Sequence, residues 1–182
     1  MFYIIGLGNP GEEYVGTRHN TGREAVEFFD RHFAEASRGK KEKFEIIHSN
    51  EFMNNSGKAV AKIIKSKKVA ENLIVVHDDI DLPIGTMKIS YNKGTGGHKG
   101  LDSVVKAVKT KEFVRIRIGV SPATAKGRAK KPEGEKAVID FILHKFKPAE
   151  MEIMKKNFKK ISEAISTLIL EGRERAMNQF NQ

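Results

Sequence analysis

One glycine-rich segment of the chain carries the side chains best suited to chemistry. It runs from Gly6 to Gly11, and Thr17-Arg-His-Asn20 follows it, so His19 comes close in sequence to two asparagines. An imidazole can take a proton from water, and asparagine amides are neutral hydrogen-bond donors. The chain has no cysteine, and no nucleophilic serine motif accompanies the histidine. We therefore predict a water molecule activated by a general base, with His19 as that base.

The same glycines also match a different motif. Gly6-Leu-Gly-Asn-Pro-Gly11 fits G-x-G-x-x-G after the apolar run Phe2–Ile5, as in dinucleotide-binding proteins. In that fingerprint the third glycine lies inside a helix, whereas Pro10 keeps Asn9 away from helical angles. We expect no nicotinamide or flavin cofactor, and a nucleotide-dependent oxidoreductase is left as an alternative.

An acidic cluster follows a second apolar run. His77-Asp-Asp-Ile-Asp81 offers a carboxylate that could hold the Nδ1–H of a histidine and so select its tautomer. Three acids beside a histidine also suit a divalent cation, but the cluster lacks a second histidine at ligand spacing. The sequence therefore predicts no metal site.

Two further segments could contact a substrate. Phe52-Met-Asn-Asn-Ser-Gly57 places two asparagines just before a predicted helix, and only one residue is needed as its cap, which leaves Asn54 free. The loop Gly94–Gly100 is rich in glycine and runs into another helix, an arrangement that suits phosphate. It lacks the Gly-Lys-Ser/Thr ending of a nucleotide-binding P-loop, which disfavours triphosphate hydrolysis.

The overall charge of the chain points to a polyanionic partner. Its 182 residues carry a formal net charge of +10. Nucleic acid is favoured over a membrane, because no anchor or strongly amphipathic basic helix accompanies the charge. The stretch Ser121–Lys136 reads as a mobile basic loop that either contacts nucleic acid or is simply solvated. A lysine-rich solvated surface is the alternative explanation for the whole charge.

The elements that must position these residues alternate along the chain. Strands are predicted at Phe2–Leu7, Leu73–His77, Met87–Tyr91 and Val114–Val120, with Phe44–Ile47 as a possible fifth. Helices are predicted at Thr21–Ala36, Ser56–Ser66, His98–Thr110, Lys136–Leu143 and from Pro148 to about Glu171. This alternation predicts an α/β fold, a single domain over residues 1–182 with a mixed, largely parallel twisted sheet flanked by helices. We expect the site to form beyond the strand ends, from His19, His77–Asp78 and the loop before Lys99.

The composition also suggests where the protein acts. The chain opens directly on a predicted core strand, without the charged and apolar regions of a signal peptide, and has no apolar run long enough to span a bilayer. We therefore expect a cytoplasmic protein that does not bind membranes. No heptad pattern demands an oligomer, so a monomer is expected.

Taken together, the motifs resemble those of bacterial-type peptidyl-tRNA hydrolases. The resemblance runs in order from Phe2 to about Phe146. It rests on Gly6–Gly11 with Tyr14 and Thr17–Gly22, Phe52–Asn54 with Ser56–Val60, His77–Pro83, Gly96–His98 and Arg115–Gly119.

The resemblance implies an activity and roles for particular residues. The family hydrolyses the ester between a peptide and the terminal ribose of tRNA, in peptidyl-tRNAs released from ribosomes, without a cofactor. His19 matches its base and Asp78 the carboxylate that orients the base. The residues that match its substrate-binding positions are Asn9, Tyr14, Met53, Asn54 and Lys99. The residues expected to contact nucleic acid are Lys88, Gly97, His98, Arg117, Lys126, Arg128, Lys130 and Lys131.

The chain departs from the family pattern at two places. Lys99 stands where the family commonly has asparagine, and an ammonium can donate a hydrogen bond but cannot accept one. The stretch between Lys43 and Phe52 is also short, where the family usually has room for an extra hairpin. A non-hydrolytic RNA-binding protein on the same scaffold is the alternative, and the joint presence of His19, Asp78, Asn9 and Asn54 argues against it.

Overall fold

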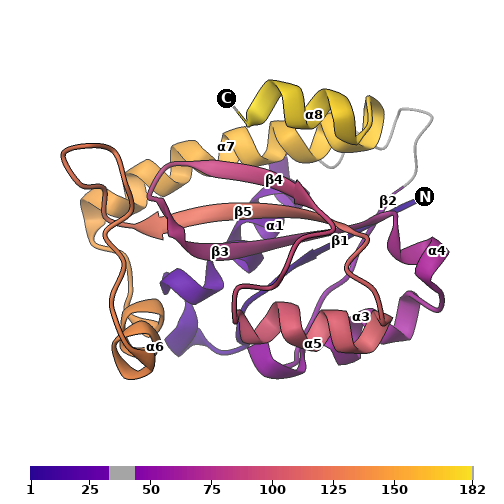
Figure 1. The fold of residues 1–182 in the computed structure, drawn as a ribbon, viewed down its shortest axis with the longest axis horizontal. Coiled ribbons are helices and arrows are strands. Elements are labelled where there is room, and N and C mark those ends of the chain that lie inside the picture. Colours follow the sequence, from indigo (N-terminus) through magenta and orange to yellow (C-terminus); the bar gives the residue numbers. More distant parts are fainter. Residues whose placement is uncertain (33–43, 182) are drawn as a thin grey trace.

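A computed structural model describes residues 1–32 and 44–181, and these form an α/β protein built on one five-stranded sheet (Figure 1). The strand order is β2-β1-β3-β5-β4, with β4 antiparallel to β5 and every other pairing parallel. The strands are β1 (Phe2–Gly6), β2 (Phe44–Ile46), β3 (Leu73–Pro83), β4 (Met87–Tyr91) and β5 (Val114–Ser121). The fold class predicted from the sequence is confirmed.

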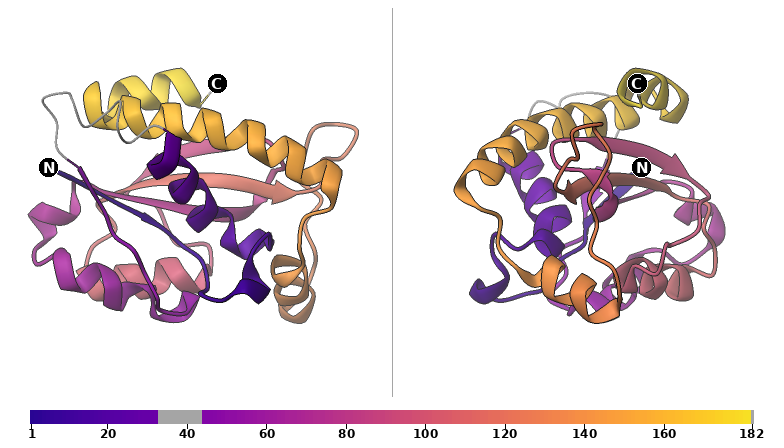
Figure 2. Two further views of the ribbon diagram at one scale, coloured as in Figure 1. Left: turned by 180° about the vertical axis from the view of Figure 1, so that it is seen from behind. Right: turned by 60° about the vertical axis from the view of Figure 1, so that its left-hand side comes forward.

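Helices cover both faces of this sheet (Figure 2). The helices are α1 (Thr21–His32), α3 (Ser56–Ile63), α4 (Lys67–Ala70), α5 (Lys99–Val108), α6 (Glu135–Leu143), α7 (Pro148–Leu170) and α8 (Arg173–Phe180). The described residues also include single turns of 3-10 helix, namely η1 (Glu12–Tyr14), η2 (Arg18–Asn20) and η3 (Met53–Asn55). Among the helices of the described residues, none has the length and apolar character needed to cross a bilayer.

The alternation of side chains along the strands creates two separate cores. Ile4, Ile74 and Val76 face α1, α7 and α8, whereas Ile5 and Val75 face α3 and α5. Successive residues of a strand point to opposite faces, so the continuous apolar runs of β1 and β3 serve both cores. These central strands form the rigid base on which the polar residues that follow them are held.

Two glycines bring α1 unusually close to the sheet. A Cβ on Gly6 would lie 2.3 Å from the Gly22 carbonyl oxygen, and one on Gly22 would lie 2.2 Å from the Val76 carbonyl oxygen. The glycine-rich segment therefore permits close backbone packing, and α1 begins only at Thr21, well after Gly11. This is not the strand-to-helix turn that a dinucleotide fingerprint requires.

Several predicted element ends differ from the observed ones. β3 continues to Pro83 instead of ending at His77, because β5 pairs with it as far as Asp79 and, after an irregularity, again at Pro83. Asp78 therefore lies within a strand. α3 ends at Ile63 instead of Ser66, because the Ser66 side chain accepts a hydrogen bond from the Val69 backbone and starts α4. The predicted helical residues 33–36 lie outside the described residues. α8 was not predicted.

The glycine-rich loop before α5 reaches the site by an unexpected route. β4 runs antiparallel to β5, so the chain leaves β4 at the far end of the sheet from the ends of β1 and β3. The segment between β4 and α5 then runs back across the sheet face to the start of α5 (Figure 1). The prediction that this loop lies just beyond a strand end at the site was wrong, although it still delivers His98 there.

Candidate active site

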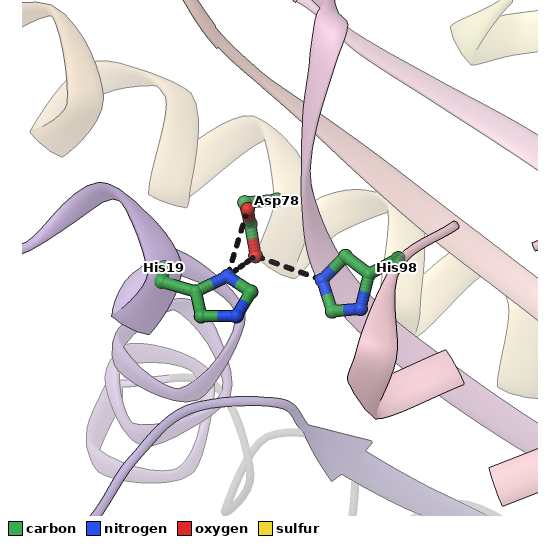
Figure 3. Close-up of side chains that lie close together, drawn as sticks. All are labelled: His19, Asp78 and His98. Carbon is green, nitrogen blue, oxygen red and sulfur yellow. Dashed lines mark hydrogen bonds and ion pairs between the residues drawn. The ribbon is translucent and has the colours of Figure 1, made fainter. Parts of the chain in front are cut away.

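A buried histidine–aspartate pair forms the centre of the candidate site (Figure 3). His19 lies in η2, the turn that leads into α1, and its Nδ1 is 3.0 Å from Asp78 Oδ1 and 3.1 Å from Oδ2. The side chains are only 10% and 3% exposed, respectively. Because Nδ1 is committed to the carboxylate, Nε2 is the ring nitrogen left to exchange a proton with a substrate or water.

A second histidine contacts the same carboxylate. His98 Nε2 lies 3.0 Å from Asp78 Oδ1, on the opposite side of Asp78 from His19 (Figure 3). The Leu101 backbone N–H donates to His98 Nδ1 at 3.3 Å, which makes His98 the cap of α5. His98 Nδ1 is thus an acceptor, and Nε2 carries the proton that is donated to Asp78.

The charges of these groups follow from their mutual contacts. Burial lowers the pKa of His19, but attraction to Asp78 and the hydrogen bond between them raise it by more, so it is raised from its usual 6.5. Burial alone would raise the pKa of Asp78, yet the two imidazoles hold it well below its usual value. Asp78 therefore stays ionised and can stabilise a proton on His19.

His77, the residue before Asp78, is kept neutral. Burial, and then the neighbouring His98, lower the pKa of His77 to about 3. Its Nδ1 donates to the Asp78 carbonyl oxygen at 2.7 Å. His77 thus braces the strand beneath the site and is not itself a proton carrier near neutral pH.

His19, Asp78 and His98 also bring three possible metal-ligand atoms within 4.8 Å of one another. A nitrogen that binds a metal must be unprotonated. The bond from Leu101 to His98 Nδ1 places the proton on Nε2, the atom that would have to bind the ion. The geometry therefore fits a hydrogen-bonded chain centred on Asp78 better than a metal centre.

Two asparagines hold the glycine-rich segment against the His19 turn. The Asn9 backbone N–H donates to Asn20 Oδ1 at 2.7 Å, and Asn20 Nδ2 donates back to the Asn9 carbonyl oxygen at 2.9 Å. Asn20 directly follows His19, so this pairing fixes Asn9 beside the base. In turn, the Met53 backbone N–H donates to Asn9 Oδ1 at 2.8 Å.

Of the remaining predicted substrate-binding residues, Met53, Asn54 and Tyr14 lie on this asparagine side of the site, and Lys99 does not. Met53 is only 4% exposed, and its sulfur packs so close to Gly100 that a Cβ there would lie 2.4 Å away. Asn54 is exposed. Tyr14 packs edge-on against Phe52, with 6.3 Å between ring centroids, and Phe52 is 52% exposed.

The other side of the site opens into a cavity of about 470 Å³. Of the predicted site residues, it is lined by His19, Asp78, Gly97, His98, Lys99, Arg117 and Lys131. An apolar part of the lining comes from α6, through Val138, Ile139 and Ile142. Asn9, Tyr14, Met53 and Asn54 do not line this cavity, so the predicted residues divide into two groups on either side of the His19–Asp78 pair.

The basic residues also divide by position. Lys99 is exposed at the first position of α5. Arg117 donates through Nε to Asp79 at 2.6 Å, and Lys88 lies opposite Arg117 on β4. Lys131 forms an exposed ion pair with Asp81. Lys126, Arg128 and Lys130 are exposed in the loop before α6 and do not line the cavity.

Sequence reasoning missed three contributors to this geometry. His98 was expected only as a nucleic-acid contact, whereas the structure buries it against Asp78. Asn20 was noted without its pairing to the Asn9 backbone. Arg115, which is 3% exposed, donates to the Gly94 carbonyl oxygen and holds the glycine-rich loop. The alternation of Arg115 and Arg117 with apolar residues in β5 was a usable signal for Arg115. It places both arginines on one face of the strand, and both line the cavity.

This fold and site define an α/β protein with a mostly parallel five-stranded sheet that places a carboxylate-oriented histidine beside asparagine amides. The family model for peptidyl-tRNA hydrolase matches residues 3–182. The chain belongs to the peptidyl-tRNA hydrolase family.

Individual relatives agree along the whole chain. This chain is 38% identical to the peptidyl-tRNA hydrolase of Pseudothermotoga lettingae, in an alignment that covers 100% of this chain and 97% of the relative. It is 34% identical to that of Thermodesulfovibrio yellowstonii, covering 100% of both. The crystal structure of peptidyl-tRNA hydrolase from Acinetobacter baumannii has a TM-score of 0.79 at 27% identity, covering 100% of this chain and 94% of that one.

Proposed function

We propose that this protein hydrolyses the ester bond of peptidyl-tRNA with a water molecule activated by His19. The observation that carries the proposal is the pairing of His19 Nδ1 with Asp78, which leaves Nε2 as the proton acceptor within a family of peptidyl-tRNA hydrolases. Because Asp78 is ionised, it stabilises the imidazolium that forms when water gives up its proton.

The reaction proceeds in two steps. His19 Nε2 takes a proton from water, and the oxygen attacks the ester carbonyl carbon to form a tetrahedral oxyanion. The carbon–oxygen bond to the terminal ribose then breaks, and His19 returns its proton to the departing ribose oxygen. The products are a tRNA with a free ribose hydroxyl and a peptide carboxylic acid, which loses its proton to solvent to become a carboxylate, and the imidazole is again neutral.

Neutral amides suit the stabilisation of the oxyanion. Asn9 Oδ1 is occupied by the Met53 N–H, so the Asn9 side chain faces a substrate as a donor through Nδ2. Asn54 adds a second exposed amide on the same side. Donors without charge bind an oxyanion or a peptide carbonyl without lowering the pKa of the nearby base as a cation would.

The two sides of the site suggest how the substrate lies. The peptide lies on the asparagine side, with Tyr14 and Met53. The tRNA lies on the cavity side, where Lys99 supplies positive charge and where Arg117 and Lys131, paired with Asp79 and Asp81, add hydrogen-bond donors. Lys88, Lys126, Arg128 and Lys130 are exposed outside the cavity and extend the proposed tRNA-binding surface. No metal, nicotinamide or flavin is part of the proposal, and the reaction is assigned to a single-domain, monomeric, cytoplasmic protein that does not bind membranes.

The alternative of an RNA-binding protein without activity is not favoured. Such a protein would have no need for the His19–Asp78–His98 arrangement or for the buried pairing of Asn9 with Asn20. A positively charged surface would be enough for such a protein to bind RNA.

The deciding experiment compares two tRNA esters that differ only at the amino group. Purified protein is incubated with N-acetyl-aminoacyl-tRNA and with the unblocked aminoacyl-tRNA, and release of the amino acid is followed. We expect cleavage of the blocked ester alone. Equal cleavage of both would indicate an unspecific esterase, and cleavage of neither would support the RNA-binding alternative.

A further inference from the structure

Helix α6 forms part of the cavity lining, and its contact with the cores is slight: half-buried Phe141 packs against the core beneath α1 and α7. None of its residues is buried, and Ile139 and Leu143 are 45% and 41% exposed. Figure 2 shows it standing apart from the two helical layers, at the end of the sheet. One half-buried side chain does not by itself fix the orientation of the apolar face of α6, so other contacts must contribute.

The backbone joins the end of α6 to the turn that carries His19. The Arg18 N–H donates to the His144 carbonyl oxygen at 3.2 Å, and the Phe146 N–H donates to the Gly16 carbonyl oxygen at 2.9 Å. Thr17 and Lys145 form an antiparallel bridge between these two bonds. The His19 turn and the exit from α6 are thus one hydrogen-bonded unit.

The side chain of Arg18 completes this junction. Its Nη2 donates to both carboxylate oxygens of Glu150, at 3.1 and 2.9 Å, and its Nη1 donates to the carbonyl oxygens of His144 and Lys145 at 3.2 Å each. Only 7% of the side chain is exposed. One planar guanidinium therefore joins η2, the C-terminal end of α6 and the first turn of α7.

The same guanidinium also fixes the rotation of α6 about its axis. Its Cζ lies 4.5 Å from the ring centroid of Phe141, which does not line the cavity. At about 100° per residue, Phe141 lies roughly 60° around the helix from Val138 and 100° from Ile142, two cavity residues. Holding Phe141 against Arg18 thus holds the apolar face of α6 toward the cavity.

We propose that Arg18 is a positioning residue for the hydrolysis of peptidyl-tRNA. It holds the apolar cavity-lining face of α6 in a fixed position relative to His19. It thereby sets the affinity for the tRNA part of the substrate. This rests on the proposed function. Lysine cannot replace arginine here, because an ammonium cannot form the two-pronged contact with Glu150, reach both carbonyl oxygens and stack on Phe141.

The test compares Arg18→Lys with Arg23→Lys, a matched change at an arginine whose ion pair with Glu27 is more exposed and does not contact α6. For Arg18→Lys we expect KM for N-acetyl-aminoacyl-tRNA to rise about 3- to 10-fold, with kcat changed less than about twofold. The acid limb of the pH profile should not move, because the His19–Asp78 pair is untouched. Arg23→Lys should behave like the parent.

A double-mutant cycle tests the route through α6. If Arg18 acts by holding Phe141, Arg18→Lys combined with Phe141→Leu should raise KM no further than the stronger single change. Additive effects would overturn the proposal, as would a fall in kcat with KM unchanged, a shifted acid limb, or losses equal to those of Arg23→Lys.

A structural reporter separates this proposal from the proposed function. The chain contains no tryptophan, so Leu143→Trp would place a single fluorophore at the end of α6. In that background Arg18→Lys should increase quenching by acrylamide, whereas Arg23→Lys should not. Unchanged quenching would overturn the role of Arg18 even if the parent is active, and increased quenching in a protein that cleaves no tRNA ester would instead reject the proposed function.

Discussion

Two parts of the cavity lining are built in opposite ways. His19 and Asp78 are buried and hydrogen-bonded to each other at 3.0 and 3.1 Å, beside the central strands of the sheet. The loop of residues 122–134 and α6 contain no buried residue, and the end of α6 is joined to the His19 turn through Arg18. The contrast matches the proposed mechanism, in which the first region holds the proton acceptor in a precise position and the second binds a large, hydrated polyanion.

The largest effect that would sharpen this contrast is expected in the buried region. His19→Ala removes the proton acceptor and should lower kcat by about a hundredfold to ten-thousandfold. Binding of tRNA should hardly change, because the imidazole contributes no phosphate contact in this scheme. Turnover of N-acetyl-aminoacyl-tRNA and tRNA affinity measure the two quantities, and near-parental turnover would remove His19 from the mechanism.

A smaller loss is expected for Asp78→Asn. The amide offers one acceptor oxygen in place of two and no charge to stabilise the imidazolium. The parent needs neutral His19, whose pKa is raised above 6.5, so its activity should fall as pH drops through that raised value. Without the carboxylate the pKa of His19 falls, and the acid limb of kcat should move to lower pH.

Asp79→Asn is the matched control for that change. Asp79 pairs with Arg117 and not with His19. If Asp79→Asn moved the acid limb and Asp78→Asn did not, the orienting role would belong to Asp79.

Lys99 stands at the border between the two regions. An ammonium at the start of α5 should attract phosphate or oxyanion charge, so Lys99→Ala should weaken turnover or tRNA binding about tenfold. Lys99→Asn restores the residue common in the family and should keep activity. Parental behaviour of both variants would show that Lys99 points into solvent and contributes nothing specific.

The smallest effect per residue is expected in the exposed loop. Lys126, Lys130 and Lys131 are replaced together with alanine. If all three contact phosphates, the slope of log tRNA affinity against log salt concentration should become less steep by up to about three. kcat at saturating substrate should stay near that of the parent. The matched control replaces Lys156, Lys159 and Lys160, which are exposed on α7, and an equal change in both variants would mean that the charge acts only in bulk.

The sequence predicted what depends on residue type and periodicity. The alternation of β1 and β3 with helices was enough for the fold class, and the motifs around His19 and Asp78 were enough for the family. Contacts between distant segments were not predictable in this way. The capping of α5 by His98, which turns its Nε2 toward Asp78, depends on a loop that crosses the sheet after an antiparallel strand.

The extension of β3 past His77 has the same kind of cause. It depends on β5 continuing alongside, and no local pattern in the acidic cluster reveals that partner. The two-sided arrangement of the site was also invisible in the sequence. Asn9 and Lys99 come from motifs of similar appearance, yet only Lys99 lines the cavity.

The bond from the Met53 backbone to Asn9 Oδ1 has a consequence for inhibitor chemistry. That bond favours one of the two orientations of the Asn9 amide, with Oδ1 toward Met53 and the Nδ2 donor on the other branch. A reversible inhibitor would therefore gain affinity from a carbonyl, sulfonyl or phosphonate oxygen placed against Asn9 Nδ2. An amine or anilide N–H in the same place would set donor against donor, so otherwise isosteric compounds should differ sharply in potency at this one position.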